Sequence, residues 1–426
     1  MADVAVLTMY PTTGPSPVQT GALGHAVYSI DCYDLTTVDL CRYVVLVIPS
    51  TVDQEFLARN RAVIRAFLDS GRVLIFGGHL HRDWLPGAEL FRPIPTPSPR
   101  AYRVARVADH PIFAGVRTDD LTFRRGVAGF FARGHHPVPD GGEVLAWLDG
   151  GEPVTYVDQV STAGTIVVQA TCDLFGYASG LDNTASRIPG QLLNWAVSQA
   201  VDKALVSESR SAATRSGLAA VYGGSSHHHR ALTAPKYARH LAGGLVYLPD
   251  LADADLTGLD GLIVPERIHR GMLNRAAARI LELLDSGGTV VAFCGGEPPP
   301  EFLPGVRWEH RPTNYWWWLQ PDADLALRTP NPDHSFFGHL TLRDCTWHYH
   351  GVLDPPEKAD VLITLETGEA LMYVDRRSTR GTLVVATLDP LSHYGAYFMP
   401  AAERFLDGFM PWITRTARAE TRRPAR

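Results

Sequence analysis

The sequence predicts an α/β protein built from two similar domains in tandem, each with a mostly parallel sheet. Two observations carry this prediction: a long internal repeat, and short apolar runs that alternate with helical patterns. Tyr156 to Val168 reads YVDQVSTAGTIVV and Tyr373 to Val385 reads YVDRRSTRGTLVV, with nine of thirteen positions identical. Similarity at a fixed spacing is typical of repeated structural units.

Further matches recur in the same order at a spacing close to 216 residues. FLDSG at 67–71 corresponds to LLDSG at 283–287, and DHPIF at 109–113 corresponds to DHSFF at 333–337. At 426 residues, the chain also exceeds the usual size of one hydrophobic core. We therefore expect copy one at 1–203, a polar linker at 204–215, copy two at 216–414 and a basic tail at 415–426.

Within each copy, short apolar runs lack polar alternation, which predicts strands buried on both faces, as in a parallel sheet. Examples are VVLVI at 44–48, VLIF at 73–76 and TIVVQA at 165–170. Apolar residues at helical spacing lie between them and predict helices that cover the sheet: Leu57, Ile64, Phe67 and Leu68 in copy one, and Leu273, Ile280, Leu281 and Leu284 in copy two. Alternating strands and helices predict a doubly wound α/β layer.

Charge and composition argue against several classes of partner. The net charge of -6 gives no global field that attracts nucleic acid or anionic lipid, and the arginines of the C-terminal tail are interpreted as a solvated segment. Five scattered cysteines predict neither a disulfide framework nor a zinc site. Without a signal-peptide pattern or an apolar run of about 18 residues, we expect a cytoplasmic protein that does not insert into membranes.

The order of features resembles the class I glutamine amidotransferase-like superfamily, and in particular its ThuA-like and β-galactosidase-trimerisation branches. The shared pattern is a strand ending in proline (Pro49 and Pro265), a helix, a strand leading into Gly-Gly, the DHPIFAG segment at 109–115 and a closing strand with GTIVV or GTLVV. The resemblance implies two flavodoxin-like domains, with any site at the carboxyl ends of the strands.

Catalytic members of that superfamily carry a cysteine on a sharp G-x-C-x-G elbow. Copy two reads AFCGG at 292–296, which places Cys294 at the elbow, whereas copy one reads LIFGG at 74–78 and has no nucleophile. The base of the family follows the last core strand as His-Pro-x-Glu, but here Asp389 stands in the histidine position. His393 lies four residues further on and is interpreted as a solvated loop residue. The Gly-Gly pair expected after Pro265 is also replaced. We therefore favour a structural cysteine over a nucleophile, with Cys294, His393 and Asp389 as the catalytic candidates.

Histidines are the other candidates for chemistry. His227, His228 and His229 follow a Gly-Gly-Ser-Ser turn that we expect at the same rim as Cys294, but three consecutive side chains cannot all bind one ion. We predict no metal and no cofactor. The pairs His79/His81, His135/His136 and His348/His350 show no clear carboxylate partner in sequence and are interpreted as solvated or internally satisfied.

The run Tyr315-Trp316-Trp317-Trp318 is the strongest sequence signal for a binding surface. Read as a strand, it places Trp316 and Trp318 on one face and Trp317 on the other. Core packing, a protein interface and a sugar-stacking platform remain open.

The favoured function is a non-catalytic binding or assembly protein with a protein partner or self-association. The alternatives are a hydrolase or amide-transferring enzyme that uses Cys294, and a carbohydrate-related protein of the ThuA-like type. A small-molecule or sugar ligand is compatible with the favoured function, and nucleic acid is not expected.

Overall fold

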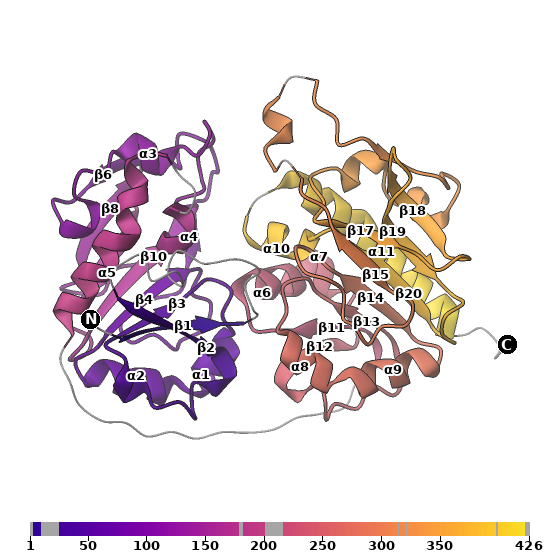
Figure 1. Cartoon of the computed structure of the whole chain (residues 1–426), viewed down its shortest axis with the longest axis horizontal. Helices are drawn as coiled ribbons and strands as arrows, with labels where there is room; N and C mark the ends of the chain where they lie inside the picture. Colours follow the sequence, from indigo (N-terminus) through magenta and orange to yellow (C-terminus); the bar gives the residue numbers. More distant parts are fainter. Residues whose placement is uncertain are drawn as a thin grey trace. The chain divides into compact units, whose positions relative to one another are not determined.

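The computed structural model describes residues 3–9, 25–178, 182–200, 216–313, 315–320, 322–397 and 399–421. The chain forms two compact units, Met1–Arg210 and Ser211–Arg426, and Figure 1 labels most of their helices and strands. The predicted linker at 204–215 lies outside the described residues, as do residues 422–426 of the predicted tail. Residues 415–421 continue a helix instead of beginning a tail.

Unit one contains an eight-stranded sheet in the order β2-β1-β3-β4-β10-β9-β8-β6. The first five strands run parallel, and the last three are antiparallel to their neighbours. The strands are β1 (Asp3–Thr8), β2 (Ala26–Asp31), β3 (Val45–Ile48), β4 (Val73–Gly78), β6 (Val104–Val107), β8 (Glu143–Leu148), β9 (Pro153–Asp158) and β10 (Thr165–Ala170), with a separate pair β5 (Arg92–Pro93) and β7 (Gly134–His135). The apolar runs at 44–48, 73–76 and 165–170 thus supply β3, β4 and β10, in the centre of the sheet.

Helices cover both faces of this sheet. Apolar residues of α2, among them Ile64 and Phe67, pack with Leu74 and Phe76 of β4, and α5 packs on the other face. The helices are α1 (Gln54–Arg59), α2 (Arg61–Asp69), α3 (Thr118–Thr122), α4 (Leu174–Ala178) and α5 (Ile188–Gln199), with 3-10 turns η1 (Cys32–Asp34), η2 (Leu40–Arg42), η3 (Pro111–Phe113) and η4 (Thr184–Arg187). Alternate residues of each central strand point to opposite faces, so a run that is apolar throughout fills two cores.

Unit two repeats the strand order as β12-β11-β13-β14-β20-β19-β17-β15, with β16 and β18 added beside β19. Its first five strands are parallel. The strands are β11 (Gly217–Tyr222), β12 (Gly244–Tyr247), β13 (Leu259–Val264), β14 (Thr289–Phe293), β15 (Arg307–His310), β16 (Leu327–Arg328), β17 (Gly351–Asp354), β18 (Asp360–Leu365), β19 (Ala370–Asp375) and β20 (Thr382–Ala386). Both units are therefore α/β with mostly parallel sheets, and the order of their parallel strands is the flavodoxin-like 2-1-3-4-5.

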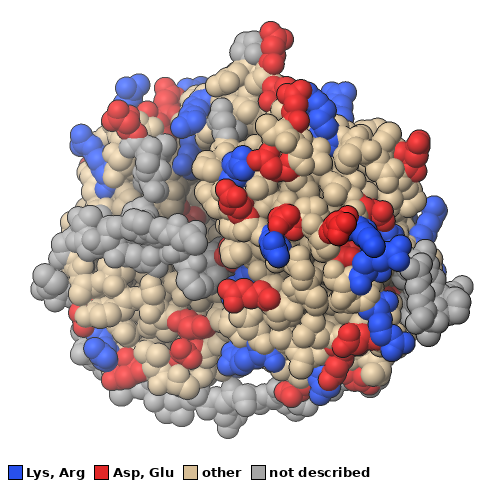
Figure 2. All heavy atoms as spheres, turned by 45° about the vertical axis from the view of Figure 1, so that its right-hand side comes forward, with Lys and Arg blue, Asp and Glu red and all other residues tan. Residues whose placement is uncertain are grey.

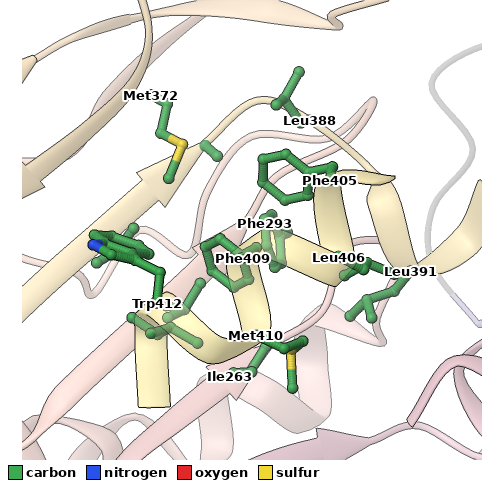
Figure 3. Packing of buried hydrophobic residues seen from close by; sticks show 14 of the residues in the cluster. Ile263, Phe293, Met372, Leu388, Leu391, Phe405, Leu406, Phe409, Met410 and Trp412 are labelled. Atoms are coloured by element: carbon green, nitrogen blue, oxygen red, sulfur yellow. The ribbon is translucent and has the colours of Figure 1, made fainter. Parts of the chain in front are cut away.

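The helices of unit two also cover both faces. They are α6 (Ser226–Thr233), α7 (Pro235–Ala238), α8 (Arg270–Arg275), α9 (Ala277–Asp285), α10 (Pro390–Gly395) and α11 (Pro400–Thr421), with 3-10 turns η5 (Leu248–Asp250), η6 (Trp317–Leu319), η7 (Ser335–Gly338) and η8 (Leu342–Cys345). Figure 3 shows α11 against the sheet, where Phe409 packs on Phe293 of β14 with ring centroids 5.2 Å apart. Helices α8 and α9 cover the opposite face with Leu273, Ile280 and Leu284.

The repeated DSG sequence has a local structural reason. It ends α2 in unit one and α9 in unit two, and its glycines, Gly71 and Gly287, have φ of 81° and 93°. A helix commonly ends on a residue in this left-handed region, which glycine adopts without a Cβ clash.

Charges of both signs are interspersed on the face shown in Figure 2. In the described part of the chain, no helix is long and apolar enough to cross a membrane.

Candidate functional site

The candidate site lies in unit two, where the central parallel strands end. Strands β13, β14 and β20 are consecutive neighbours in the sheet, so the residues that follow them come to one edge. Glu266 and Arg267 follow β13, Cys294 follows β14, and Asp389 follows β20. This is the edge where ligands bind in doubly wound α/β folds.

Asp389 is at the centre of the site, with none of its surface exposed. Its Oδ2 accepts hydrogen bonds from His350 Nε2 at 3.0 Å and from Arg267 Nη2 at 3.1 Å. Its Oδ1 accepts from Trp347 Nε1 at 3.2 Å and lies 3.2 Å from His393 Nε2. Both carboxylate oxygens are therefore directed at imidazole, indole and guanidinium groups.

Three imidazoles face this carboxylate. His348 Nε2 lies 3.5 Å from Asp389 Oδ1 and 2.9 Å from His393 Nε2. One ligand atom from each of His348, His350 and Asp389 falls within 4.8 Å of the others. We refer to His348, His350, His393 and Asp389 as the histidine–aspartate cluster.

Two chain segments bring the cluster together. His348 and His350 precede β17, and the backbone N–H of His350 donates to Thr387 Oγ1 at 3.4 Å, which ties this segment to the end of β20. His393 lies on α10, which begins directly after Asp389, so the spacing of four places both side chains on one side of its first turn. The predicted solvated position for His393 is wrong, because α10 buries its side chain to 15 % exposure.

A second expectation was also wrong: the sequence predicted no carboxylate partner for the His348/His350 pair, but the structure contains one. The partner is Asp389, about forty residues further along the sequence, and both histidines are buried. The sequence did contain a signal for this cluster: an H-x-H pair (His348 and His350) precedes one strand, and a D-x-x-x-H pair (Asp389 and His393) follows a later parallel strand. It becomes informative only when the strands are known to be close.

The charge state of the cluster follows from its surroundings. Burial alone would raise the pKa of Asp389, but the imidazoles of His393 and His350 hold it well below its ordinary value. Burial lowers the pKa of His393, against the opposing effect of Asp389. At neutral pH the cluster therefore contains an ionised carboxylate, and the His393 imidazole is neutral.

Arg267 adopts a backbone conformation that is unfavourable for its residue type. Its φ is 54°, in the left-handed region that residues other than glycine seldom adopt. Such a conformation persists when surrounding contacts maintain it. The bond from Arg267 to Asp389 is one of these contacts.

Glu266 lies beside the cluster and is 1 % exposed. Its Oε1 accepts from the backbone N–H of Ser392 at 2.6 Å, whereas Oε2 has no hydrogen-bond partner among the described residues. Burial, and then the negative charge of Asp389, raise the pKa of Glu266 to about 7. The sequence did not predict Glu266 or Arg267 as site residues. They were noted only as the residues that replace an expected Gly-Gly pair.

Cys294 does not join these groups by a hydrogen bond. Its side chain is 1 % exposed and belongs to an apolar cluster with Leu303, Leu353 and Tyr373. Its Sγ lies 3.9 Å from the carbonyl oxygen of Ala292, and no hydrogen bond to a histidine occurs within the described ranges. Burial raises the pKa of Cys294 to about 12, so the thiol is protonated at neutral pH.

The aromatic run lies next to the cluster and is not a strand. Residues Trp317–Leu319 form a 3-10 turn, so the expected strand is wrong, although Trp316 and Trp318 still lie together while Trp317 contacts Trp347. Trp316 and Trp318 are stacked with ring centroids 6.4 Å apart, and the indole Nε1–H of Trp317 donates to the backbone carbonyl of Trp347. Aromatic residues favour strands only where a neighbouring strand pairs with them. No strand among the described residues pairs with this turn; instead, the hydrogen bond from the Trp317 indole to Trp347 holds it in place.

Tyr315 connects the aromatic run to the cluster. Its hydroxyl lies 3.3 Å from His350 Nδ1, and its ring centroid is 4.9 Å from that of His348. Tyr315 and Trp318 are 46 % and 42 % exposed. A polar buried cluster and an exposed aromatic surface therefore meet at this tyrosine.

His227, His228 and His229 lie in the first turn of α6, where Ser225 Oγ accepts from the His228 N–H at 3.3 Å. Burial lowers the pKa of His228 to about 4, and its ring hydrogen-bonds to the backbone of Glu266. Among the described residues, the group whose ligand atoms converge is His348, His350 and Asp389, and it includes none of this run. Successive helical side chains point in different directions, which separates the three rings.

The fold defines the class: a doubly wound α/β protein whose site lies at the carboxyl ends of its parallel strands. No protein-family model and no curated protein matches the sequence. Among solved structures, one match is a protein from Thermoplasma acidophilum described as a putative subunit of GMP synthase, with 11 % identity and a TM-score of 0.27. The match covers 49 % of this chain and 100 % of that one. A likeness this weak carries no information about activity.

Proposed function

We propose that the chain is a binding or assembly protein made of two copies of a class I glutamine amidotransferase-like domain with the pattern of the ThuA-like branch. The copies share nine of thirteen residues in their closing hairpins. They also share the order of the eight strands that form the main path of each sheet. A gene duplication accounts for both observations with one event.

The observation that carries the non-catalytic proposal is the orientation of Asp389. It occupies the sequence position of the superfamily's catalytic histidine, and its carboxylate contacts His350 and Arg267. A cysteine nucleophile needs a base within hydrogen-bond reach and access to substrate. Cys294 is buried, has a pKa near 12 and donates towards a backbone carbonyl. These facts favour a structural thiol over the hydrolase alternative.

For the binding surface, we propose the aromatic segment at 315–319 and a protein partner or a second copy of this chain. Tyr315, Trp318 and Leu319 are each at least 40 % exposed, and neighbouring aromatic side chains of this kind dominate many protein interfaces. A sugar ligand is the alternative, because sugar rings stack on indoles such as those of Trp316 and Trp318.

Alkylation by iodoacetamide tests the role of Cys294, because the thiolate form and its access set the rate. The chain supplies its own standard, since Cys41 is exposed and Cys294 is buried. We expect rapid labelling of Cys41 in the native protein, and labelling of Cys294 only after unfolding. Peptide mass spectrometry measures each rate separately. Rapid labelling of Cys294 that a simple amide or ester suppresses would contradict the proposal and support the hydrolase.

A further inference from the structure

We propose that the histidine–aspartate cluster of unit two is a binding site for a divalent transition-metal ion, with zinc as the best match to its donors. This inference names a ligand for the cluster beside the aromatic segment that the proposed function assigns to binding, which Tyr315 joins to the cluster. It rests on the proposed function only for the biological role of the site, because the arrangement of the donor atoms is observed whatever that role is.

The spacing of the donor atoms is the first argument. With Zn–N bonds of about 2.05 Å, neighbouring ligands of a tetrahedral zinc ion lie about 3.3 Å apart. The imidazole Nε2 atoms of His348 and His393 are 2.9 Å apart, and those of His348, His350 and His393 lie 3.5, 3.0 and 3.2 Å from oxygens of Asp389. Among the described residues, the ligand atoms of His348, His350 and Asp389 converge within 4.8 Å of one another, so these three form the core of the proposed site, and His393 lies beside it against His348 and Asp389.

The number of imidazoles is the second argument. One buried carboxylate is neutralised by one guanidinium, and Arg267 already provides this contact with Asp389. Three further imidazoles, all presenting Nε2 to one carboxylate, exceed what charge neutralisation requires. Imidazole with carboxylate is a donor set that suits zinc, copper, iron and nickel, whereas magnesium and calcium favour oxygen ligands.

The groups behind these donors have the arrangement of an outer coordination shell. The Tyr315 hydroxyl lies 3.3 Å from His350 Nδ1, on the side of the ring away from Asp389, and Trp347 Nε1 donates to Asp389 Oδ1. Thr387 holds the backbone of His350. Such contacts orient ligands before the ion binds.

Among the residues of unit one that the structure describes, no such group of donors occurs, and this provides an internal control. There, Thr171 Oγ1 accepts from the backbone N–H of Arg133 at 2.9 Å, so Arg133 takes the place that His350 has beside Thr387. Asp173, at the position equivalent to Asp389, accepts from the backbone N–H groups of Phe175 and Gly176 at the start of its own helix. Its carboxylate therefore serves as a helix cap.

The test uses the full chain without a polyhistidine tag, stripped with a chelator. Titration calorimetry with ZnCl2 and the visible spectrum with CoCl2 measure stoichiometry and ligand geometry. We expect one ion per chain and no heat with MgCl2. We expect His350→Gln and His393→Gln each to weaken zinc binding at least tenfold, with Asp173→Asn and His229→Gln unchanged as matched controls. Circular dichroism confirms that each variant is folded.

The inference is overturned if the wild-type chain takes up no stoichiometric zinc, or if His229→Gln weakens binding while the cluster variants do not. If a cluster variant fails to fold, the cobalt spectrum of the wild-type chain decides. Intense bands of a four-coordinate site support the inference, and the weak spectrum of hydrated cobalt refutes it. The alkylation rate of Cys294 is measured separately, so a reactive thiol would contradict the proposed function without affecting the metal result.

Discussion

Replacing Asp389 by asparagine tests how much the cluster contributes to folding. The substitution keeps the volume and one carbonyl oxygen but removes the charge that faces His350 and Arg267. A hydrogen bond to a charged group contributes about 1.5–3 kcal/mol. Weakening two of them in a site with no solvent exposure should lower the free energy of unfolding by about 3 kcal/mol.

The assay is urea unfolding followed by tryptophan fluorescence, with chelator present so that metal binding does not contribute. Six of the nine tryptophans lie in unit two, so the signal reports mainly on that unit. Asp173→Asn is the matched control. Its carboxylate accepts two backbone N–H groups, and asparagine caps a helix as well as aspartate, so we expect a change below about 0.5 kcal/mol.

The pH dependence has a defined sign. The folded pKa of Asp389 lies well below its ordinary value of 3.8, so the stabilisation by its charge is complete above that value. It is lost as the pH falls towards the folded pKa. The difference between wild type and Asp389→Asn should therefore shrink below about pH 4. Equal stability of the two proteins at pH 7, or an equally large effect of Asp173→Asn, would refute the reasoning.

Two further predictions concern neighbours of the cluster. The pKa of Glu266 is raised from 4.5 to about 7, so ionisation destabilises the fold as the pH rises through this interval. Glu266→Gln keeps the acceptor for Ser392 and should stabilise unit two by up to about 3 kcal/mol at pH 8 but not at pH 4; unfolding curves at the two pH values with no such difference would contradict this. Trp317→Ala should cost about 2 kcal/mol of stability, because the half-buried indole donates to Trp347. Trp318→Ala should change stability by less than about 1 kcal/mol but weaken association in sedimentation velocity; equal destabilisation by both variants, with association unchanged, would show that the run only supports the fold.

Residues close together in sequence determined the α/β class and the central strands. Apolar runs at 44–48 and 73–76 could be interpreted directly, because a strand buried on both faces must be apolar at every position. The stripe of Ile280 and Leu284 predicted α9 for a similar reason, since helical spacing places these side chains on one face. Such patterns depend on neighbours within one turn or one strand, so no tertiary information was needed.

The aromatic run shows where this reasoning ends. Strand propensity placed Trp316 to Trp318 in an extended segment, but the structure has a 3-10 turn. Whether an aromatic segment becomes a strand depends on a pairing partner elsewhere in the chain. The contact of Trp317 with Trp347, thirty residues away, is visible only in the folded protein.

The site depended still more on tertiary structure. Asp389 and His393 were selected from sequence as remnants of a catalytic motif, and the position of Asp389 at a strand end followed from the repeat. Its partners His348 and His350 come from a segment about forty residues earlier, and Arg267 from one more than 120 residues earlier. Parallel strands that are adjacent in the sheet are separated along the chain by whole crossover connections. The sequence therefore identified single residues at strand ends, whereas only the order of strands in the sheet decided which of them share one carboxylate.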